Sequence, residues 1–198
     1  MTQTNHKRPA AFIDRDGTLV EEVNYLSRVD DLRLFPFTAE ALRLLRQAGF
    51  LIVVVTNQSG IGRSIYGESD MRSIHDAMQQ LLEGVIDAFY FCPHLPDTGC
   101  RCRKPRLGMI EDAVADLNID LDGSWMIGDK NIDVETGRNA GIRSAMVLTG
   151  YGEEHLHSLD SPPDVVAANL LEAVQRIVQA RMVGSLTVNS APVSEPSL

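Results

Sequence analysis

The segment Ala10-Ala11-Phe12-Ile13-Asp14-Arg15-Asp16-Gly17-Thr18 decides the fold. Its four apolar residues lead directly into a polar turn, a pattern typical of a buried strand whose carboxyl end opens into a loop. The run Leu51–Val55 repeats this pattern, because its β-branched residues end at Thr56-Asn57-Gln58-Ser59-Gly60. We therefore predict two strands of one sheet, each followed by a loop whose side chains can bind a ligand.

Amphipathic helices alternate with short apolar runs along the rest of the chain. Further strands are predicted at Phe89–Phe91, Trp125–Ile127 and Ser144–Leu148. Helices are predicted at Ala39–Ala48, Ser69–Leu82, Met109–Leu117, Val134–Ala140 and Leu170–Met182. This alternation predicts an α/β fold of three layers, a Rossmann-like parallel sheet with helices on both faces. Ligands of such folds bind beyond the carboxyl ends of the strands, so the loops after Ile13, Val55 and Ile127 should line one crevice.

The 198 residues, 44% of them hydrophobic and 23% charged, are typical of one globular domain. We expect residues 1–182 to form it and residues 183–198, which are rich in Ser, Pro and Thr, to be a mobile tail. Eighteen basic residues against 27 acidic ones give a net charge of −9, which argues against nucleic acid or an anionic membrane as a partner. The longest apolar run, Phe50–Val55, is too short to span a bilayer. We expect a cytoplasmic monomer.

Four carboxylates follow two of the predicted strands: Asp14 and Asp16 after the first, and Asp129 and Asp133 in Gly128-Asp129-Lys130-Asn131-Ile132-Asp133. Carboxylates gathered in one crevice repel one another unless a cation lies among them, and oxygen ligands suit Mg²⁺. The sequence therefore predicts a magnesium site, which would also allow an anionic substrate to bind to an acidic protein.

The same crevice should contain groups that bind phosphate. Lys104, together with the hydroxyl and amide groups of Thr56, Asn57 and Gln58, can hold phosphoryl oxygens and neutralise developing charge. Hydrolysis of phosphate monoesters is among the slowest uncatalysed reactions, so a covalent intermediate that divides it into two steps is expected. Asp14 and Asp16 suit the nucleophile and the general acid/base of such a reaction.

These motifs, in this order, resemble the four motifs of the haloacid dehalogenase superfamily of phosphohydrolases: Asp14-Arg15-Asp16-Gly17-Thr18, Thr56-Asn57, Lys104, and Gly128-Asp129 with Asp133. The resemblance covers about residues 10–150. It implies that Asp14 is the nucleophile, Asp16 the acid/base, and that Thr56 and Lys104 bind the phosphoryl group. It also implies that Mg²⁺ is held by Asp14, the backbone carbonyl of Asp16, and Asp129, with Asp133 as an outer partner.

All three cysteines of the chain lie in one loop, as Cys92-Pro93-His94 and Cys100-Arg101-Cys102. Three thiols and an imidazole are a common ligand set for a closed tetrahedral zinc site, whereas an odd number of cysteines argues against a disulfide framework. The alternative is three reduced cysteines and a surface histidine. A zinc ion at Cys92, His94, Cys100 and Cys102 would be structural, and would order the backbone that leads into Arg103 and Lys104.

This loop narrows the resemblance to two branches of the superfamily, the heptose-bisphosphate phosphatases and the histidinol-phosphate phosphatases. Ser59 favours the heptose branch, which removes the 7-phosphate of a heptose 1,7-bisphosphate; histidinol phosphate remains the alternative substrate. The resemblance implies substrate contacts from Arg103, Lys130, Asn57, Gln58, Ser59 and the loop that contains Glu22 and Tyr25. The chain departs from the heptose branch by Asn24 before Tyr25 and by a shorter loop between His94 and Cys100, and it has only a small cap.

A catalytically inert binding protein on the same fold is a further hypothesis, against which the presence of both Asp14 and Asp16 counts.

Overall fold

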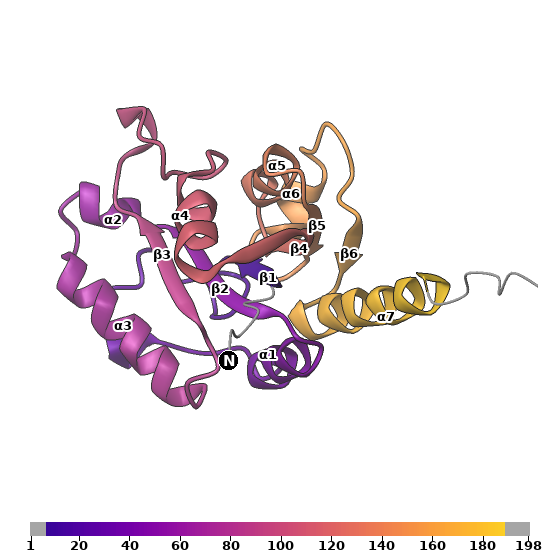
Figure 1. Ribbon diagram of the computed structural model, residues 1–198. Coiled ribbons are helices and arrows are strands. Elements are labelled where there is room, and N and C mark those ends of the chain that lie inside the picture. The colour runs from indigo at the N-terminus through magenta and orange to yellow at the C-terminus, as the bar shows by residue number, and fades with distance from the viewer. Residues whose placement is uncertain (1–6, 189–198) are drawn as a thin grey trace, which may run out of the picture.

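The computed structural model describes residues 7–188, which form a six-stranded parallel sheet in the order β3-β2-β1-β4-β5-β6 (Figure 1). The strands are β1 (Arg8–Ile13), β2 (Leu51–Asn57), β3 (Ala88–Cys92), β4 (Ile119–Gly128), β5 (Arg143–Val147) and β6 (Val165–Ala167). Strand β1 lies in the middle, because it pairs with both β2 and β4. Its residues 10–13 are fully buried, as expected for a strand covered on both faces.

Helices cover both faces of the sheet. One face packs against α1 (Thr38–Gln47), α3 (Glu68–Leu81) and α7 (Leu170–Val188), and the other against α4 (Gly108–Leu117) and α5 (Asn131–Asn139). Successive side chains of a strand point to opposite faces. In β1, therefore, Ala11 and Ile13 join the core beneath α1 and α7, whereas Ala10 and Phe12 join the core beneath α4. The predicted three-layer α/β architecture is confirmed.

Besides two 3-10 turns, three elements within residues 7–188 were not predicted from the sequence. They are the strand β6 and the short helices α2 (Ser59–Gly62) and α6 (Gly152–Leu156). None of them has more than five residues, which is too short for a hydrophobic period to be distinguished from a loop.

The prediction that the final helix ends at Met182 is wrong. Helix α7 continues to Val188, six residues into the expected tail. Each residue added to an existing helix gains a hydrogen bond, and the next proline, which would end a helix, is Pro192. The rest of the expected mobile tail, residues 189–198, lies outside the described residues.

The connection from β1 to α1 contains no inserted domain, only a 3-10 turn at Val29–Asp31. The carboxyl ends of the central strands are therefore reached through an open crevice, in agreement with the expected small cap. Within residues 7–188, no helix combines the length and the apolar character needed to cross a membrane.

Candidate active site

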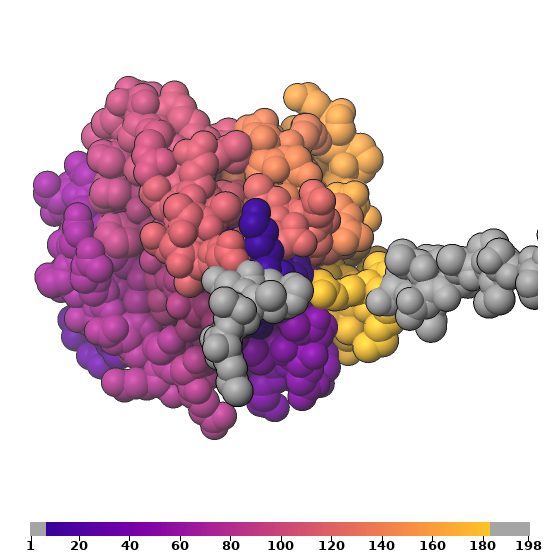
Figure 2. Space-filling view, viewed as in Figure 1, coloured from indigo at the N-terminus to yellow at the C-terminus, as the bar shows by residue number. Residues whose placement is uncertain are grey.

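The carboxyl ends of β1, β2 and β4 lie side by side at the centre of the sheet. Ile13 is in register with Val54 on one side and with Ile127 on the other, and the amide of Asp14 donates to the carbonyl oxygen of Ile127 (2.9 Å). Figure 2 shows the molecule indented at its upper edge, between the pink segment near residue 100 and the orange segment beyond residue 140. The loops after the three strands meet as the sequence predicts.

Lys104 lies between two buried carboxylates. Its Nζ is 2.8 Å from Asp14 Oδ1 and 2.7 Å from Asp133 Oδ1, and each of the three side chains is at most 6% exposed. Burial alone would raise the pKa of Asp14, but the ammonium groups of Lys104 and Lys130 outweigh it and hold that pKa below its usual range. Asp14 is therefore ionised, with a carboxylate that can act as a nucleophile.

Asp129 has a carboxylate oxygen without a partner. Its Oδ2 accepts from the backbone amide of Tyr151 (2.9 Å), whereas its Oδ1 is buried and has no hydrogen-bond partner within residues 7–188. Burial and the nearby charge of Asp14 raise the pKa of Asp129 to about 7. Oxygen atoms of Asp14, Asp129 and Asp133 lie within 4.8 Å of one another. This donor set, which needs a positive charge, fits Mg²⁺.

Two glycines make room for Asp129. Both have positive φ angles, +79° at Gly17 and +58° at Gly150, and a Cβ atom at either position would come within 2.2 or 2.3 Å of Asp129 Oδ2. Thr149 holds the two loops together, because its hydroxyl donates to the carbonyl oxygen of Gly17 (2.6 Å). Side chains at these glycines would displace the carboxylate that is expected to bind the metal ion.

Asp16 is held by two neighbours instead of pointing freely into solvent. The guanidinium of Arg15 makes a two-pronged ion pair with its carboxylate, with Nη2 at 2.8 Å and Nε at 3.1 Å, and the amide of Gln58 donates to Asp16 Oδ2 (2.9 Å). Arg15 itself is 1% exposed. A buried arginine at this position is a residue that sequence reasoning missed, because an arginine in a polar turn is normally exposed to solvent.

Asn57 connects the end of β2 to the Lys104 loop. Its side-chain amide donates to the carbonyl oxygen of Lys104 (3.2 Å), and its Oδ1 accepts from the backbone amide of the same residue (3.0 Å). Both polar atoms of the Asn57 side chain are thus engaged with the protein, although we expected them to contact substrate. The pairing fixes the backbone from which Lys104 reaches Asp14.

The open crevice has a volume of about 210 Å³. Of the residues expected to contact substrate, Glu22, Tyr25, Asn57, Gln58, Ser59 and Lys130 line it. Lys130 pairs with Glu22 (3.2 Å) and lies 4.9 Å from the centre of the Tyr151 ring. Tyr66 and Tyr151 also line the crevice and were not predicted. Tyr151 follows the carboxyl end of β5, so the expectation that ligands bind beyond the carboxyl ends of the strands could have found it. Arg103 instead donates to the carbonyl oxygen of His94 (3.2 Å).

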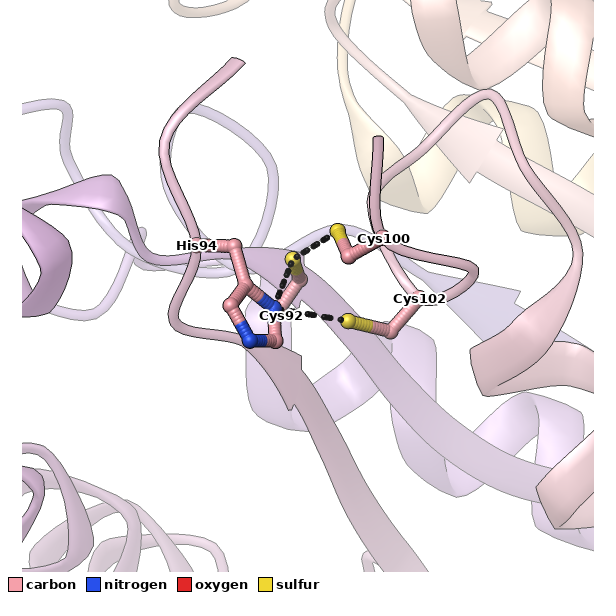
Figure 3. Close-up of side chains that lie close together, drawn as sticks. All are labelled: Cys92, His94, Cys100 and Cys102. Atoms are coloured by element: carbon pink, nitrogen blue, oxygen red, sulfur yellow. Dashed lines mark hydrogen bonds between the residues drawn. The ribbon is translucent and has the colours of Figure 1, made fainter. Parts of the chain in front are cut away.

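The cysteine loop brings its four expected ligands together (Figure 3). Cys92 Sγ lies 3.6 Å from both Cys100 Sγ and His94 Nδ1, and His94 Nδ1 lies 3.3 Å from Cys102 Sγ. In a tetrahedral site with bonds of about 2.3 Å to sulfur and 2.0 Å to nitrogen, neighbouring donor atoms are about 3.5–3.8 Å apart. The three thiols and the imidazole therefore fit a zinc ion. Cys92 ends β3, which anchors this cluster to the sheet.

The parallel sheet, the paired aspartates after β1 and the buried lysine beside them define the class of haloacid dehalogenase-like hydrolases. Residues 101–173 match the family described as HAD-hydrolase-like. Among solved structures, D,D-heptose 1,7-bisphosphate phosphatase from B. bronchiseptica, complexed with magnesium and phosphate, superposes with a TM-score of 0.81 at 32% identity. That superposition covers 87% of this chain and 99% of the other.

Two curated relatives give a more specific match. D-glycero-D-manno-heptose-1,7-bisphosphate 7-phosphatase from Thermosynechococcus vestitus is 40% identical over 86% of this chain and 95% of its own length. D-glycero-beta-D-manno-heptose-1,7-bisphosphate 7-phosphatase from Haemophilus ducreyi is 36% identical over 84% of this chain and 97% of its own length. The chain belongs to this family of heptose-1,7-bisphosphate 7-phosphatases.

Proposed function

We propose that this protein hydrolyses the 7-phosphate of D-glycero-D-manno-heptose 1,7-bisphosphate with Mg²⁺, giving heptose 1-phosphate for the synthesis of nucleotide-activated heptose. One observation carries the proposal: the buried carboxylate of Asp14 lies 2.8 Å from the ammonium of Lys104 and close to the carboxylate of Asp129, which has an unpartnered oxygen. Membership of the family supports the choice of a phosphorylated sugar as substrate.

The reaction follows from the groups at the end of β1. A carboxylate oxygen of Asp14 attacks phosphorus, the bond to the 7-oxygen of the sugar breaks, and Asp16 gives its proton to that leaving oxygen. Asp16 then takes a proton from a water molecule, which attacks the aspartyl-phosphate and releases inorganic phosphate and free Asp14. Thr56 and Lys104 bind the phosphoryl oxygens throughout. Asp14, the carbonyl of Asp16, and Asp129 would hold Mg²⁺, which neutralises charge on the phosphoryl group.

The crevice offers polar groups for the rest of the substrate. Lys130 is held at its wall by Glu22 and Tyr151, so an ammonium group is available for an anionic or hydroxyl-rich ligand. Tyr25 and Ser59, which line the crevice, are further proposed contacts, and Arg103, which donates to the carbonyl oxygen of His94, is proposed as a contact outside that lining. A crevice without an inserted domain leaves the mouth open to an extended molecule that carries a second phosphate.

An assay of phosphate release tests this function. We expect kcat/KM for the α- or β-anomer of the heptose bisphosphate to exceed that for histidinol phosphate by about a hundredfold or more, because the crevice contacts the sugar as well as the phosphoryl group. Release should need Mg²⁺ and stop when a chelator removes it. A higher kcat/KM on histidinol phosphate would show that the protein has the alternative activity. No phosphate release from the heptose bisphosphates or histidinol phosphate would support the hypothesis of an inert binding protein.

We also propose that the cluster of Cys92, His94, Cys100 and Cys102 holds a structural zinc ion. Residues 96–99 of the loop are exposed, so the ion would fix the chain that leads from Cys102 through Arg103 to Lys104. Replacing one ligand should therefore disturb Lys104, although no cysteine faces the crevice.

Cys102→Ala tests the zinc site. The purified wild-type protein should contain zinc in equal amount to the chain, whereas the variant should lose it and show kcat lowered on the order of tenfold or more, because Lys104 is displaced. Metal analysis and kinetics in excess Mg²⁺ measure the two effects. Cys102→Ala protein with full kcat, or wild-type protein free of zinc after purification without chelators, would argue for three reduced cysteines instead.

A further inference from the structure

Gln58 is buried where the end of β2 meets the loop after β1. Only 4% of the residue is exposed, and its backbone amide donates to the carbonyl oxygen of Cys92 (2.8 Å). Its side-chain Nε2 donates to Asp16 Oδ2 (2.9 Å) and to Thr56 Oγ1 (2.7 Å). The side chain thus connects two residues that the proposed reaction uses, one from each strand end.

The other end of the same amide is also fully engaged. Gln58 Oε1 accepts from Arg15 Nη2 (3.1 Å) and from the hydroxyl of Tyr66 (2.5 Å). An amide of this kind has two hydrogens to donate and two lone pairs to accept with, and all four are used here. No hydrogen-bonding capacity of the Gln58 side chain is left for a substrate.

The chemistry of the neighbours fixes which way the amide points. A guanidinium can only donate, so the atom of Gln58 that faces Arg15 Nη2 must be the oxygen Oε1. If the amide were reversed, its NH₂ would face Arg15, and two donors would meet. The NH₂ of Gln58 therefore faces Thr56.

This orientation determines the direction of the hydrogen on Thr56. The Thr56 hydroxyl has one hydrogen and two lone pairs, and one lone pair accepts from Gln58. The hydroxyl hydrogen is then free to point away from Gln58, so it can donate to a phosphoryl oxygen. An acceptor in place of the NH₂ would attract that hydrogen instead.

We propose that Gln58 is a positioning residue: it directs the Thr56 hydroxyl hydrogen towards the phosphoryl group and holds Asp16 in place, and it does not contact substrate. The inference rests on the proposed function, since it assigns Gln58 to act through two residues of that reaction. It replaces the substrate contact that the sequence indicated for this residue. Arg15 and Tyr66 serve the same arrangement from the far side of the amide.

Two variants of Gln58 separate this role from that of a substrate contact. Gln58→Met removes the donors at a similar volume, and we expect kcat to fall on the order of tenfold to a hundredfold while KM stays within about threefold. Gln58→Glu keeps the shape and the acceptor for Arg15 and Tyr66, but it places acceptors beside Thr56 and Asp16. Its kcat should be lower than that of Gln58→Met, because the Thr56 hydroxyl can then donate to the new carboxylate.

Thr56 provides the decisive comparison. In a Thr56→Val background no hydroxyl hydrogen remains to be directed, so the difference in kcat between the Gln58→Met and Gln58→Glu substitutions should shrink several-fold. Gln80→Met, at an exposed position on α3, is the matched control and should behave as wild type. Thermal unfolding of every variant shows whether it is folded. If Gln58→Met does not fold, the proposal is tested by the kcat of Gln58→Glu alone.

Three results would overturn the proposal. The first is a Gln58→Met variant with KM raised about tenfold and kcat unchanged, and the second is a Gln58→Glu variant as active as wild type. The third is a difference in kcat between Gln58→Met and Gln58→Glu that is the same with and without the Thr56 hydroxyl. The comparison can use any phosphate monoester that the wild-type protein hydrolyses. A failure of the heptose assignment would appear in the wild-type assay alone, whereas a failure of the Gln58 proposal would appear only between variants.

Discussion

Asp14→Asn should abolish turnover and leave the fold intact. The amide has nearly the same shape as the carboxylate but is not a nucleophile, so kcat should fall on the order of 10⁴-fold or more. The fold should survive because Lys104 keeps its second partner, Asp133, at 2.7 Å. Steady-state kinetics and thermal unfolding, measured on the same preparation, give the two results.

A matched control for this substitution is Asp97→Asn, which makes the same chemical change on an exposed 3-10 turn. It should have wild-type kcat, because its carboxylate lies outside the crevice. An Asp14→Asn protein that is folded and fully active would show that another group attacks phosphorus. A loss of activity accompanied by a loss of the folded state would point to a structural role of Asp14.

Lys104→Met should have the second largest effect, on both activity and stability. It removes the ammonium that neutralises charge on the phosphoryl group, and we expect kcat to fall on the order of 10²- to 10³-fold. It also leaves Asp14 and Asp133 as buried carboxylates without their common partner. Breaking a buried ion pair by removing one partner costs about 3–5 kcal/mol of the free energy of unfolding.

The stability loss should depend on pH in a defined direction. Burial already raises the pKa of Asp133 to about 6 in the wild-type protein, and burial would raise that of Asp14 if the ammonium groups did not outweigh it. Without Lys104, we expect both pKa values to lie higher than in the wild-type protein and above those of the unfolded chain. The folded state then holds more protons than the unfolded state, so the variant becomes less stable as pH rises. The difference in free energy of unfolding from wild type should be larger at about pH 8 than at about pH 5.

Urea unfolding at the two pH values measures this difference. Lys7→Met, which removes an exposed lysine outside the site, is the control and should change stability little at either pH. A Lys104→Met protein equally stable relative to wild type at both pH values would contradict the assigned ion pairs.

The architecture could be predicted because the decisive signals are local. Ala10–Ile13 and Leu51–Val55 are apolar at every position, as strands buried on both faces require, and each is followed at once by polar residues. Carboxyl ends of neighbouring parallel strands lie at one edge, so the proximity of Asp14 to Asp129 and Asp133 follows from the strand order. The cysteines could be grouped because the ligands lie within one short loop.

The partners of individual polar side chains could not be predicted in the same way. Asn57 ends β2 and Gln58 follows it beside the crevice, where contact with substrate is the simplest expectation. Their amides instead bind Lys104 and the set of Arg15, Asp16, Thr56 and Tyr66. These pairings join residues up to 47 positions apart, and only the packed structure decides which donor meets which acceptor. The burial of Arg15 has the same origin.

The covalent step on Asp14 can be observed directly. Wild-type protein would be mixed with substrate carrying a radiolabelled 7-phosphoryl group in the presence of Mg²⁺, quenched with acid during turnover, and digested for peptide mapping. We expect the label on the peptide that contains Asp14, released by hydroxylamine as an acyl phosphate is, and absent from Asp14→Asn protein. Label on a different residue, or steady hydrolysis with no labelled peptide under these conditions, would contradict an aspartyl-phosphate at this position.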